Sequence, residues 1–437
     1  MYAYAKKGNV NGTCAVPGSK SATIRATILG TLADGTTVIH NPLPSKDGIA
    51  AFRVAQALGA KIEAHDEDNT WVVEGLNGKP HVPDCVIDTM NSGTTTSFTI
   101  GAASLVTDGY VVITGDEQIC RRPWGDEVRA LAGLGAEAFM TRPGNECPPV
   151  VIRGPIHGGE CTMLGHNSQH ISGLLVPAAL LPEGESVDIY LTDPKEAMYV
   201  QLTVQWLERF GVKVESSADF KHYHVEGGQK LTACDCLVAS DWSGVAFPLV
   251  AAAITDSELT ITDVDFNDAQ GDKMVADILI RMGADIEKDI EGHKLIVHGG
   301  KKLHGVEVDM DLIPDSLPIL TVAAAFAEGD SHFTNLAHVR IKETDRVAVM
   351  QEVLCACGAD VDITSDSLTV HGGKKLHGAA VSSHDDHRVC MAMCVCGLAL
   401  DEDAGEMKID NPDCAAVSFP SFYKLMESIG ANIKVAE

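Results

Sequence analysis

The chain is poor in aromatic residues and in positive charge, and the second shortage excludes whole classes of protein. Aromatic residues make up 5% of the 437 residues, and only 33 Lys and Arg stand against 61 Asp and Glu, for a net charge of −28. Nucleic-acid binding depends on cations that neutralise phosphates, so a nucleic-acid partner is excluded. An anionic membrane surface is disfavoured for the same reason.

Long apolar runs, a signal peptide and paired cysteines are also missing. No uncharged apolar run reaches the roughly 18–20 residues of a membrane span, and residues 1–7 lack the charged-then-apolar order of a signal peptide. The 13 cysteines include no CxxC pair, so neither a disulfide framework nor a metal site is indicated. We therefore expect a cytoplasmic protein whose cysteines serve as small apolar core residues.

A short pattern recurs six times along the chain. It consists of an apolar helical stretch, a glycine, a small residue and an alternating strand, as in Phe210-Gly211-Val212-Lys213-Val214. The spacing is about 73 residues, so six repeats account for the whole chain. The six glycines are Gly59, Gly135, Gly211, Gly283, Gly358 and Gly430.

Each of these glycines is placed where a helix would end. Glycine adopts the left-handed conformation of a helix C-cap without strain. Strands are predicted downstream at 294–298 and 367–371, and both are followed by Gly-Gly-Lys-Lys-Leu-His-Gly, which indicates duplication.

Each repeat also carries a helix of small apolar residues. Such helices are apolar nearly all round, which predicts that they are buried. Because one repeat cannot bury its open face alone, six repeats divide most simply into two α/β domains of three. The predicted buried stretches are 101–105, 174–181, 245–254, 319–327 and 389–400.

Cationic residues gather in four clusters. Two of them, Gly18-Ser19-Lys20-Ser21 and Asp386-His387-Arg388, precede expected helices at 23–32 and 389–400, and helix N-termini favour phosphates and carboxylates. Asn91-Ser92-Gly93-Thr94-Thr95 leads into another buried helix. The other cationic clusters are 118–123 and 340–346.

Each cluster alone has a simpler interpretation. The first cluster lacks the P-loop frame and is typical of a capped turn with a solvated lysine. Residues 342–346 are also typical of an exposed helical charge run. Residues 386–388 are also typical of an ordinary helix cap. Their recurrence at strand-to-helix junctions favours a functional site instead.

Together, these residues resemble the 5-enolpyruvylshikimate-3-phosphate (EPSP) synthase family over essentially the full chain. The two most specific matches are Lys342-Glu343-Thr344-Asp345-Arg346 and Asp386-His387-Arg388. Other matching segments are Pro17-Gly18-Ser19-Lys20-Ser21 with Arg25, Asn91-Ser92-Gly93-Thr94, Arg122-Pro123 with Gly125, Ser168-Gln169, Ile313-Pro314-Asp315 and Phe419-Pro420.

The resemblance implies a fold class and a domain organisation. The fold is a two-domain, inside-out α/β barrel-like architecture of six βαβαββ repeats, three per domain, with the active site in the cleft between the domains. By analogy, 1–20 and 241–437 form one lobe and 21–240 the other, and two crossovers form a hinge that closes on substrates.

The resemblance also implies an activity: enolpyruvyl transfer from phosphoenolpyruvate to the 5-hydroxyl of shikimate 3-phosphate, with loss of phosphate. No cofactor and no metal are expected, the partners are the two small-molecule substrates, and we expect a monomer. Asp315 and Lys20 are the candidates for deprotonating the hydroxyl, and Glu343 for proton transfer at the methylene carbon.

The remaining expected roles are in substrate binding. The resemblance assigns phosphoenolpyruvate to Lys20, Gly93, Arg122, Gln169, Arg346 and Arg388. It assigns shikimate 3-phosphate to Lys20, Ser21, Arg25, Asn167, Ser168, Gln169, Tyr199, Asp315, His338 and Lys342.

Several positions depart from the family pattern. Ser97 stands in place of an arginine and Val417 in place of a lysine, which should weaken phosphate binding. Glu196 places an acid near the expected phosphate of the acceptor, unless an insertion brings Thr192 there. His338 replaces a usual Asn, and Asn167 replaces a serine.

These departures keep two alternatives open. One is a diverged enolpyruvyl transferase that uses another anionic alcohol. The other is a non-catalytic anion-binding protein that kept the scaffold. The presence of Lys20, Asp315, Glu343, Arg346 and Arg388 disfavours the second.

Overall fold

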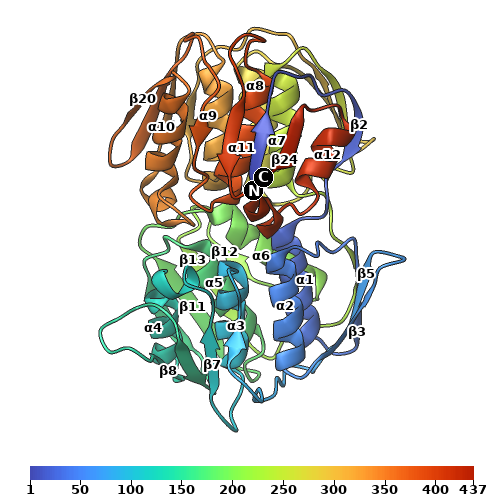
Figure 1. Ribbon diagram of the computed structural model, residues 1–437. Coiled ribbons are helices and arrows are strands. Elements are labelled where there is room, and N and C mark those ends of the chain that lie inside the picture. Colours follow the sequence, from blue (N-terminus) through green and yellow to red (C-terminus); the bar gives the residue numbers. More distant parts are fainter. The chain divides into compact units, whose positions relative to one another are not determined.

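Figure 1 presents the computed structural model, which describes residues 1–437. Contacts divide the chain into two compact units, Met1–Pro17 with Ala239–Glu437, and Gly18–Val238. The first unit is therefore built from both ends of the chain. Lys20, expected at the end of the first lobe, lies in the second unit, and residues 239–240, expected in the second lobe, lie in the first.

Each unit contains three sheets of four strands. In every sheet, two antiparallel pairs are followed at one edge by a parallel pair. The sheets of the first unit are β22 (Ala380–Val381), β23 (Met407–Asp410), β1 (Tyr2–Ala5) and β24 (Ile433–Ala436); β16 (Asp285–Asp289), β17 (Lys294–His298), β15 (Glu258–Thr262) and β2 (Gly12–Ala15); and β18 (Glu307–Asp309), β19 (Asp330–Thr334), β21 (Ser367–His371) and β20 (Asp360–Ile363).

The second unit repeats the pattern. Its sheets are β14 (Asp235–Leu237), β3 (Thr36–His40), β5 (Thr70–Glu74) and β4 (Lys61–His65); β6 (Ile87–Asp88), β7 (Val111–Thr114), β9 (Val150–Arg153) and β8 (Glu137–Met140); and β10 (Gly159–Met163), β11 (Ser186–Leu191), β13 (His222–Glu226) and β12 (Glu215–Ser216). The strands predicted at 294–298 and 367–371 are confirmed as β17 and β21.

The six repeats are confirmed, and three of them are completed by a strand from elsewhere in the chain. β2 runs parallel to β15, β14 runs parallel to β3, and β1 lies between β23 and β24. In the other three sheets, all four strands come from one continuous βαβαββ segment.

One helix of each repeat is buried on nearly all sides, as predicted. Each packs on its own sheet, and small residues allow close helix contacts within the unit. The helices begin a few residues earlier than expected, so Lys20 and His387 lie inside the first turns of α1 and α11 rather than before them. The six helices are α1 (Lys20–Leu32), α3 (Gly93–Ala103), α5 (Ser168–Ala179), α7 (Trp242–Ile254), α9 (Leu317–Ala325) and α11 (His387–Leu398).

The second helix of each repeat ends at the predicted glycine. All six glycines have positive φ, from 84° to 108°, and the following residue donates to the helix carbonyl five positions back, as Ala60 does to Ala55. This closure satisfies carbonyls at the helix end. The helices are α2 (Lys46–Ala57), α4 (Gly125–Gly133), α6 (Ala197–Arg209), α8 (Met274–Arg281), α10 (Arg346–Ala356) and α12 (Phe422–Ser428).

Five short 3-10 helices join these elements. They are η1 (Ile119–Arg121), η2 (Gly271–Lys273), η3 (Pro314–Ser316), η4 (Ala337–Ile341) and η5 (Pro412–Val417). No helix is long and apolar enough to cross a bilayer.

The cysteines are all free thiols. Seven are buried among apolar residues, as expected of core residues, whereas Cys85 and Cys355 are exposed. The buried ones are Cys14, Cys236, Cys357, Cys390, Cys394, Cys396 and Cys414. No group of three or more His, Cys, Asp or Glu side chains is arranged to hold a metal ion.

Candidate active site

Most of the predicted site residues lie at the N-termini of the buried helices. In five of these helices a side chain at the cap position accepts a backbone N–H, and the neighbouring free N–H groups give this end a positive potential. Three of these capped ends lie in the second unit and two in the first, so the fold supplies anion-binding positions without adding basic residues. The capping residues are Ser19, Ser92, Asn167, Asp241 and Asp386.

In the first unit, Arg346 is the centre of a buried ion-pair network. It begins α10, its side chain is fully buried, and it donates to Asp315 at 2.8 Å, to Glu343 at 2.7 Å and to Asp386 at 2.7 Å. Burial opposes its charge, but the three carboxylates hold the pKa of Arg346 well above its usual value. Residues 342–346 are therefore not the exposed helical charge run of the simpler interpretation.

Arg388, in the first turn of α11, shares a carboxylate with this network. Its Nη2 donates to Asp315 Oδ2 at 2.9 Å and to Ser243 Oγ at 3.1 Å. Asp315 thus accepts from both arginines, and it keeps 19% of its side chain exposed while Glu343 keeps 16%. Two guanidinium groups and two accessible carboxyl groups are consequently held together within one unit.

Asp386 and Ser243 belong to this network but were not predicted as site residues. Asp386 is fully buried, caps α11 by accepting from the Arg388 backbone, and pairs with Arg346. Burial raises the pKa of Asp386, and Arg346 opposes that rise. The Asp-His-Arg motif already contained Asp386, whereas no sequence signal marked Ser243.

In the second unit, Lys20 lies in the first turn of α1 and is paired with an acid. Its Nζ lies 3.3 Å from Asp47 Oδ2, and both side chains are largely buried. Asp47 lies in the first turn of α2, which Ser45 caps. Sequence reasoning missed Asp47, because an acidic residue near a helix N-terminus is common for capping alone.

Arg25 is held rigidly by the helices around it. It donates to the carbonyls of Ser21 and Tyr199, each at 2.9 Å, and to Thr203 Oγ1 at 2.8 Å. Its guanidinium also lies 5.4 Å from the ring centroid of Phe98. The structure therefore brings Ser21, Arg25 and Tyr199 together, although Tyr199 contacts Arg25 through its backbone.

Gly93, Arg122 and Gln169 converge at the start of α3. A Cβ atom on Gly93 would lie 2.8 Å from Gln169 Oε1 and 3.0 Å from Arg122 Nη2, so a side chain at this position would displace these two groups. The guanidinium of Arg122 lies 5.7 Å from the Trp124 ring, and Gln169 donates to Thr94 at 3.3 Å. A cation, an amide and a helix N-terminus thus meet in one place.

A buried acidic side chain, that of Glu196, lies at the start of α5. Asn167 uses its side-chain oxygen to cap the helix at Gln169 N, and Ser168 donates to Glu196 Oε2 at 2.8 Å. Glu196 is 2% exposed, whereas Thr192 is exposed and hydrogen-bonds to the Leu164 carbonyl. Of the two residues considered for this position, Glu196 is the one that meets Ser168.

The other departures are accounted for locally. Ser97 is buried and accepts from Trp124 Nε1 at 3.0 Å, and Val417 lies at the end of η5. His338 is buried in η4, and Lys342 follows that helix. The structure thus places His338 and Lys342 in the first unit, with the Arg346 network.

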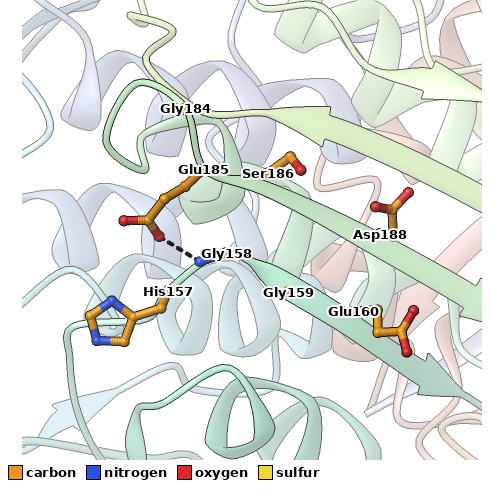
Figure 2. Close-up of a pocket in the computed structure, with 8 residues that line it drawn as sticks. All are labelled: His157, Gly158, Gly159, Glu160, Gly184, Glu185, Ser186 and Asp188. Atoms are coloured by element: carbon orange, nitrogen blue, oxygen red, sulfur yellow. Dashed lines mark hydrogen bonds between the residues drawn. The ribbon is translucent and has the colours of Figure 1, made fainter.

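A cavity of about 530 Å³ lies elsewhere in the second unit and does not contain these residues. Figure 2 shows Glu160, Glu185 and Asp188 around it, with Glu185 bonded to the Gly158 amide. Carboxylates repel anions, so this cavity is unsuited to phosphorylated substrates.

Comparison with known proteins gives one consistent result. The model of the family EPSP synthase (3-phosphoshikimate 1-carboxyvinyltransferase) matches residues 4–426. The chain is 41% identical to the 3-phosphoshikimate 1-carboxyvinyltransferase of Ruminiclostridium cellulolyticum and 40% identical to that of Acetivibrio thermocellus, with 100% of each chain covered. The EPSP synthase structure from Acinetobacter baumannii is 28% identical, with a TM-score of 0.83 over 100% of both chains. The chain therefore belongs to the EPSP synthase family, and its six four-stranded sheets with buried helices form that family's inside-out α/β fold.

Proposed function

We propose that this chain transfers the enolpyruvyl group of phosphoenolpyruvate to the 5-hydroxyl of shikimate 3-phosphate and releases phosphate. The observation that carries the proposal is the Arg346 network, in which two accessible carboxyl groups, Asp315 and Glu343, are held against two buried arginines. Full-length membership of the family supports the same activity. The reaction belongs to the shikimate branch of aromatic amino acid biosynthesis.

The reaction has two steps, and each needs a proton to move. In the addition, the acceptor oxygen loses its proton and bonds to C2 of phosphoenolpyruvate, while C3 gains a proton. In the elimination, C3 loses a proton and the bond from C2 to the phosphate oxygen breaks. Asp315, with Lys20 as the second candidate, takes the hydroxyl proton, and Glu343 delivers and later removes the proton at C3.

Arginines and helix ends supply the charge that the anions require. Arg346 and Arg388 bind the carboxylate of phosphoenolpyruvate, since guanidinium groups match carboxylates in bidentate contacts. Lys20, Gly93, Arg122 and Gln169 bind its phosphate, and the last three of these converge at the start of α3. The acceptor is positioned by Lys20, Ser21, Arg25, Asn167, Ser168, Gln169, Tyr199, Asp315, His338 and Lys342.

The test is phosphate release from phosphoenolpyruvate in the presence of shikimate 3-phosphate. Glu343→Gln and Asp315→Ala are each expected to slow turnover at least about 100-fold, the scale of acid–base groups. Glu352→Gln is the matched control, because Glu352 lies exposed on α10 and undergoes the same change of charge.

Near-normal turnover in both variants would remove the assigned roles. If the wild-type protein turns over only with another anionic alcohol, the chain is a diverged transferase. The contact of Glu196 with Ser168 favours this alternative. Anion binding with no turnover on any alcohol would indicate a non-catalytic homologue. The proposal also includes action as a cytoplasmic monomer, for which light scattering should give a mass near 46.3 kDa.

A further inference from the structure

Glu196 occupies an unusual position for a buried acid. It precedes α6 in the left-handed conformation, with φ 55° and ψ 32°, which is uncommon for a residue other than Gly, Asn or Asp. Its side chain is turned toward the start of α5, where Ser168 donates to it at 2.8 Å. A carboxylate therefore lies where two helix N-termini, those of α5 and α6, offer a positive potential.

The surroundings of Glu196 are those proposed to bind the acceptor. Tyr199 donates its backbone N–H to the Glu196 carbonyl at 2.9 Å, and the Tyr199 carbonyl accepts from Arg25. Ser168 and Arg25 are both assigned to shikimate 3-phosphate in the proposed function. The negative charge of Glu196 is also felt at His170, where it acts against the burial and the Arg122 charge that lower the pKa of that residue.

Ser168 cannot serve Glu196 and a phosphate at once. A serine hydroxyl carries a single proton, so it donates to one acceptor at a time. If the Ser168 hydroxyl keeps donating to Glu196, only its lone pairs face an incoming phosphate. A carboxylate and a phosphate side by side also repel each other.

We propose that Glu196 is an internal anion that competes with the phosphate group of the acceptor for Ser168, and so sets the affinity and selectivity of this enzyme for its acceptor. The inference rests on the proposed function, since that function places the acceptor phosphate at Ser168. Binding of the acceptor requires the Glu196 side chain to give up the hydroxyl. The free-energy cost of this competition falls on the acceptor and not on phosphoenolpyruvate, because the residues assigned to the phosphate of phosphoenolpyruvate do not include Ser168.

The test compares Michaelis constants for the two substrates in three variants. Glu196→Gln removes the charge at nearly constant shape, and Glu196→Ser replaces the acid by a short hydroxyl. Both are expected to lower KM for shikimate 3-phosphate about tenfold, the effect of one charged hydrogen bond regained, and to leave KM for phosphoenolpyruvate within about twofold. Glu160→Gln, an exposed acid on β10, is the control for net charge and should change neither constant.

A double variant tests whether Ser168 carries the hydroxyl for which Glu196 and the acceptor phosphate compete. Adding Ser168→Ala to Glu196→Gln should remove most of the gain in acceptor affinity, because the gain depends on the Ser168 proton. A retained gain would mean that Glu196 acts only by long-range repulsion, which overturns competition for Ser168. Unchanged or raised acceptor KM in both single variants would overturn the proposal as a whole.

Calorimetric titration with shikimate 3-phosphate separates this inference from the proposed function. It measures the dissociation constant for shikimate 3-phosphate without turnover, and this constant should be about tenfold lower in the two Glu196 variants. Circular dichroism confirms that each variant is folded. Wild-type turnover with unshifted binding in the variants overturns only the role of Glu196. Absence of both turnover and binding in the wild-type protein overturns the proposed function and this inference together.

Discussion

Arg346 and His170 are both buried, but the surroundings of Arg346 stabilise its charged form, whereas those of His170 stabilise its neutral form. Arg346 keeps its charge because Asp315, Glu343 and Asp386 surround it. His170 lies beside Trp124 and receives a hydrogen bond from Asn167 at 3.3 Å. Burial and the Arg122 charge lower the pKa of His170 to about 3. A buried ionisable residue is thus either fully paired or neutral.

The neutral state of His170 predicts a loss of stability in acid. An unfolded histidine takes up a proton below about pH 6.5, whereas the folded one stays neutral to about pH 3. The contribution of neutral His170 to the free energy of unfolding is therefore complete above pH 6.5 and is lost as the pH falls toward 3. Between pH 7 and pH 5 this loss is about 2 kcal/mol. His170→Gln should lower the acid sensitivity of unfolding by about that amount, as measured by urea unfolding at both pH values.

Comparison with the wild-type protein isolates this group from the many carboxylates that also titrate. An equal fall in the free energy of unfolding for both proteins between pH 7 and pH 5 would contradict a neutral, buried His170. The variant keeps a side-chain oxygen that can accept from Asn167, so the hydrogen bond at the start of α5 is not the quantity that changes.

At the scale of elements, glycine decides how closely the buried helices approach. A Cβ atom on Gly101 in α3 would lie 2.0 Å from the carbonyl oxygen of Gly173 in α5, and one on Gly173 would lie 2.7 Å from the carbonyl oxygen of Ser97 in α3. The two helices can pack at this distance only because both positions lack side chains. Glu127 of α4 lies beside Gly173, and burial raises the pKa of its carboxyl group.

Two glycine-to-alanine substitutions should therefore have opposite effects. Gly101→Ala forces α3 and α5 apart and should destabilise the protein by about 1–3 kcal/mol, the usual range for overpacking. Gly133→Ala, at the exposed end of α4, meets nothing within 4 Å and should be neutral or stabilise by up to about 1 kcal/mol. Urea unfolding of both variants at pH 7 measures the difference. Equal effects would show that the helix contact does not depend on Gly101.

At the scale of the whole molecule, the two units differ in how the chain builds them. The second unit is one continuous segment, Gly18–Val238, whereas the first needs residues from both ends. β1 lies between β23 and β24, and β2 completes the sheet of β15. Without β1, one sheet of the first unit would lose its pairing between the C-terminal strands.

This topology predicts how fragments of the chain behave. Residues 18–238 should fold alone with a cooperative transition, because all three of their sheets are complete. Residues 239–437 should not fold cooperatively until a peptide of residues 1–17 is added. Thermal unfolding followed by circular dichroism distinguishes the cases. A cooperative transition in 239–437 alone would contradict an essential role for β1 and β2.

Much of the repeat architecture could be predicted because it depends on local signals. A glycine after an apolar helical stretch indicates a helix end, and small apolar residues on all sides indicate burial. Both signals act within one or two helical turns, and they led to the positions of Gly211 and α9 directly. Motifs such as Lys342–Arg346 indicated which charged residues belong to one site.

Contacts between distant segments could not be predicted in this way. The pairing of β1 with β24 joins the two ends of the chain, and Arg388 meets Ser243 from another repeat. Asp47 and Glu196 are ordinary acidic residues in the sequence, and only their burial beside Lys20 and Ser168 gives them a chemical meaning. Amino-acid order determined the repeats and the helix ends, because these follow from backbone preference and hydrophobic spacing, and the charged motifs determined the resemblance to the family. The tertiary structure alone decided which acid meets which cation or hydroxyl, because that depends on residues tens to hundreds of positions apart being brought into hydrogen-bonding distance.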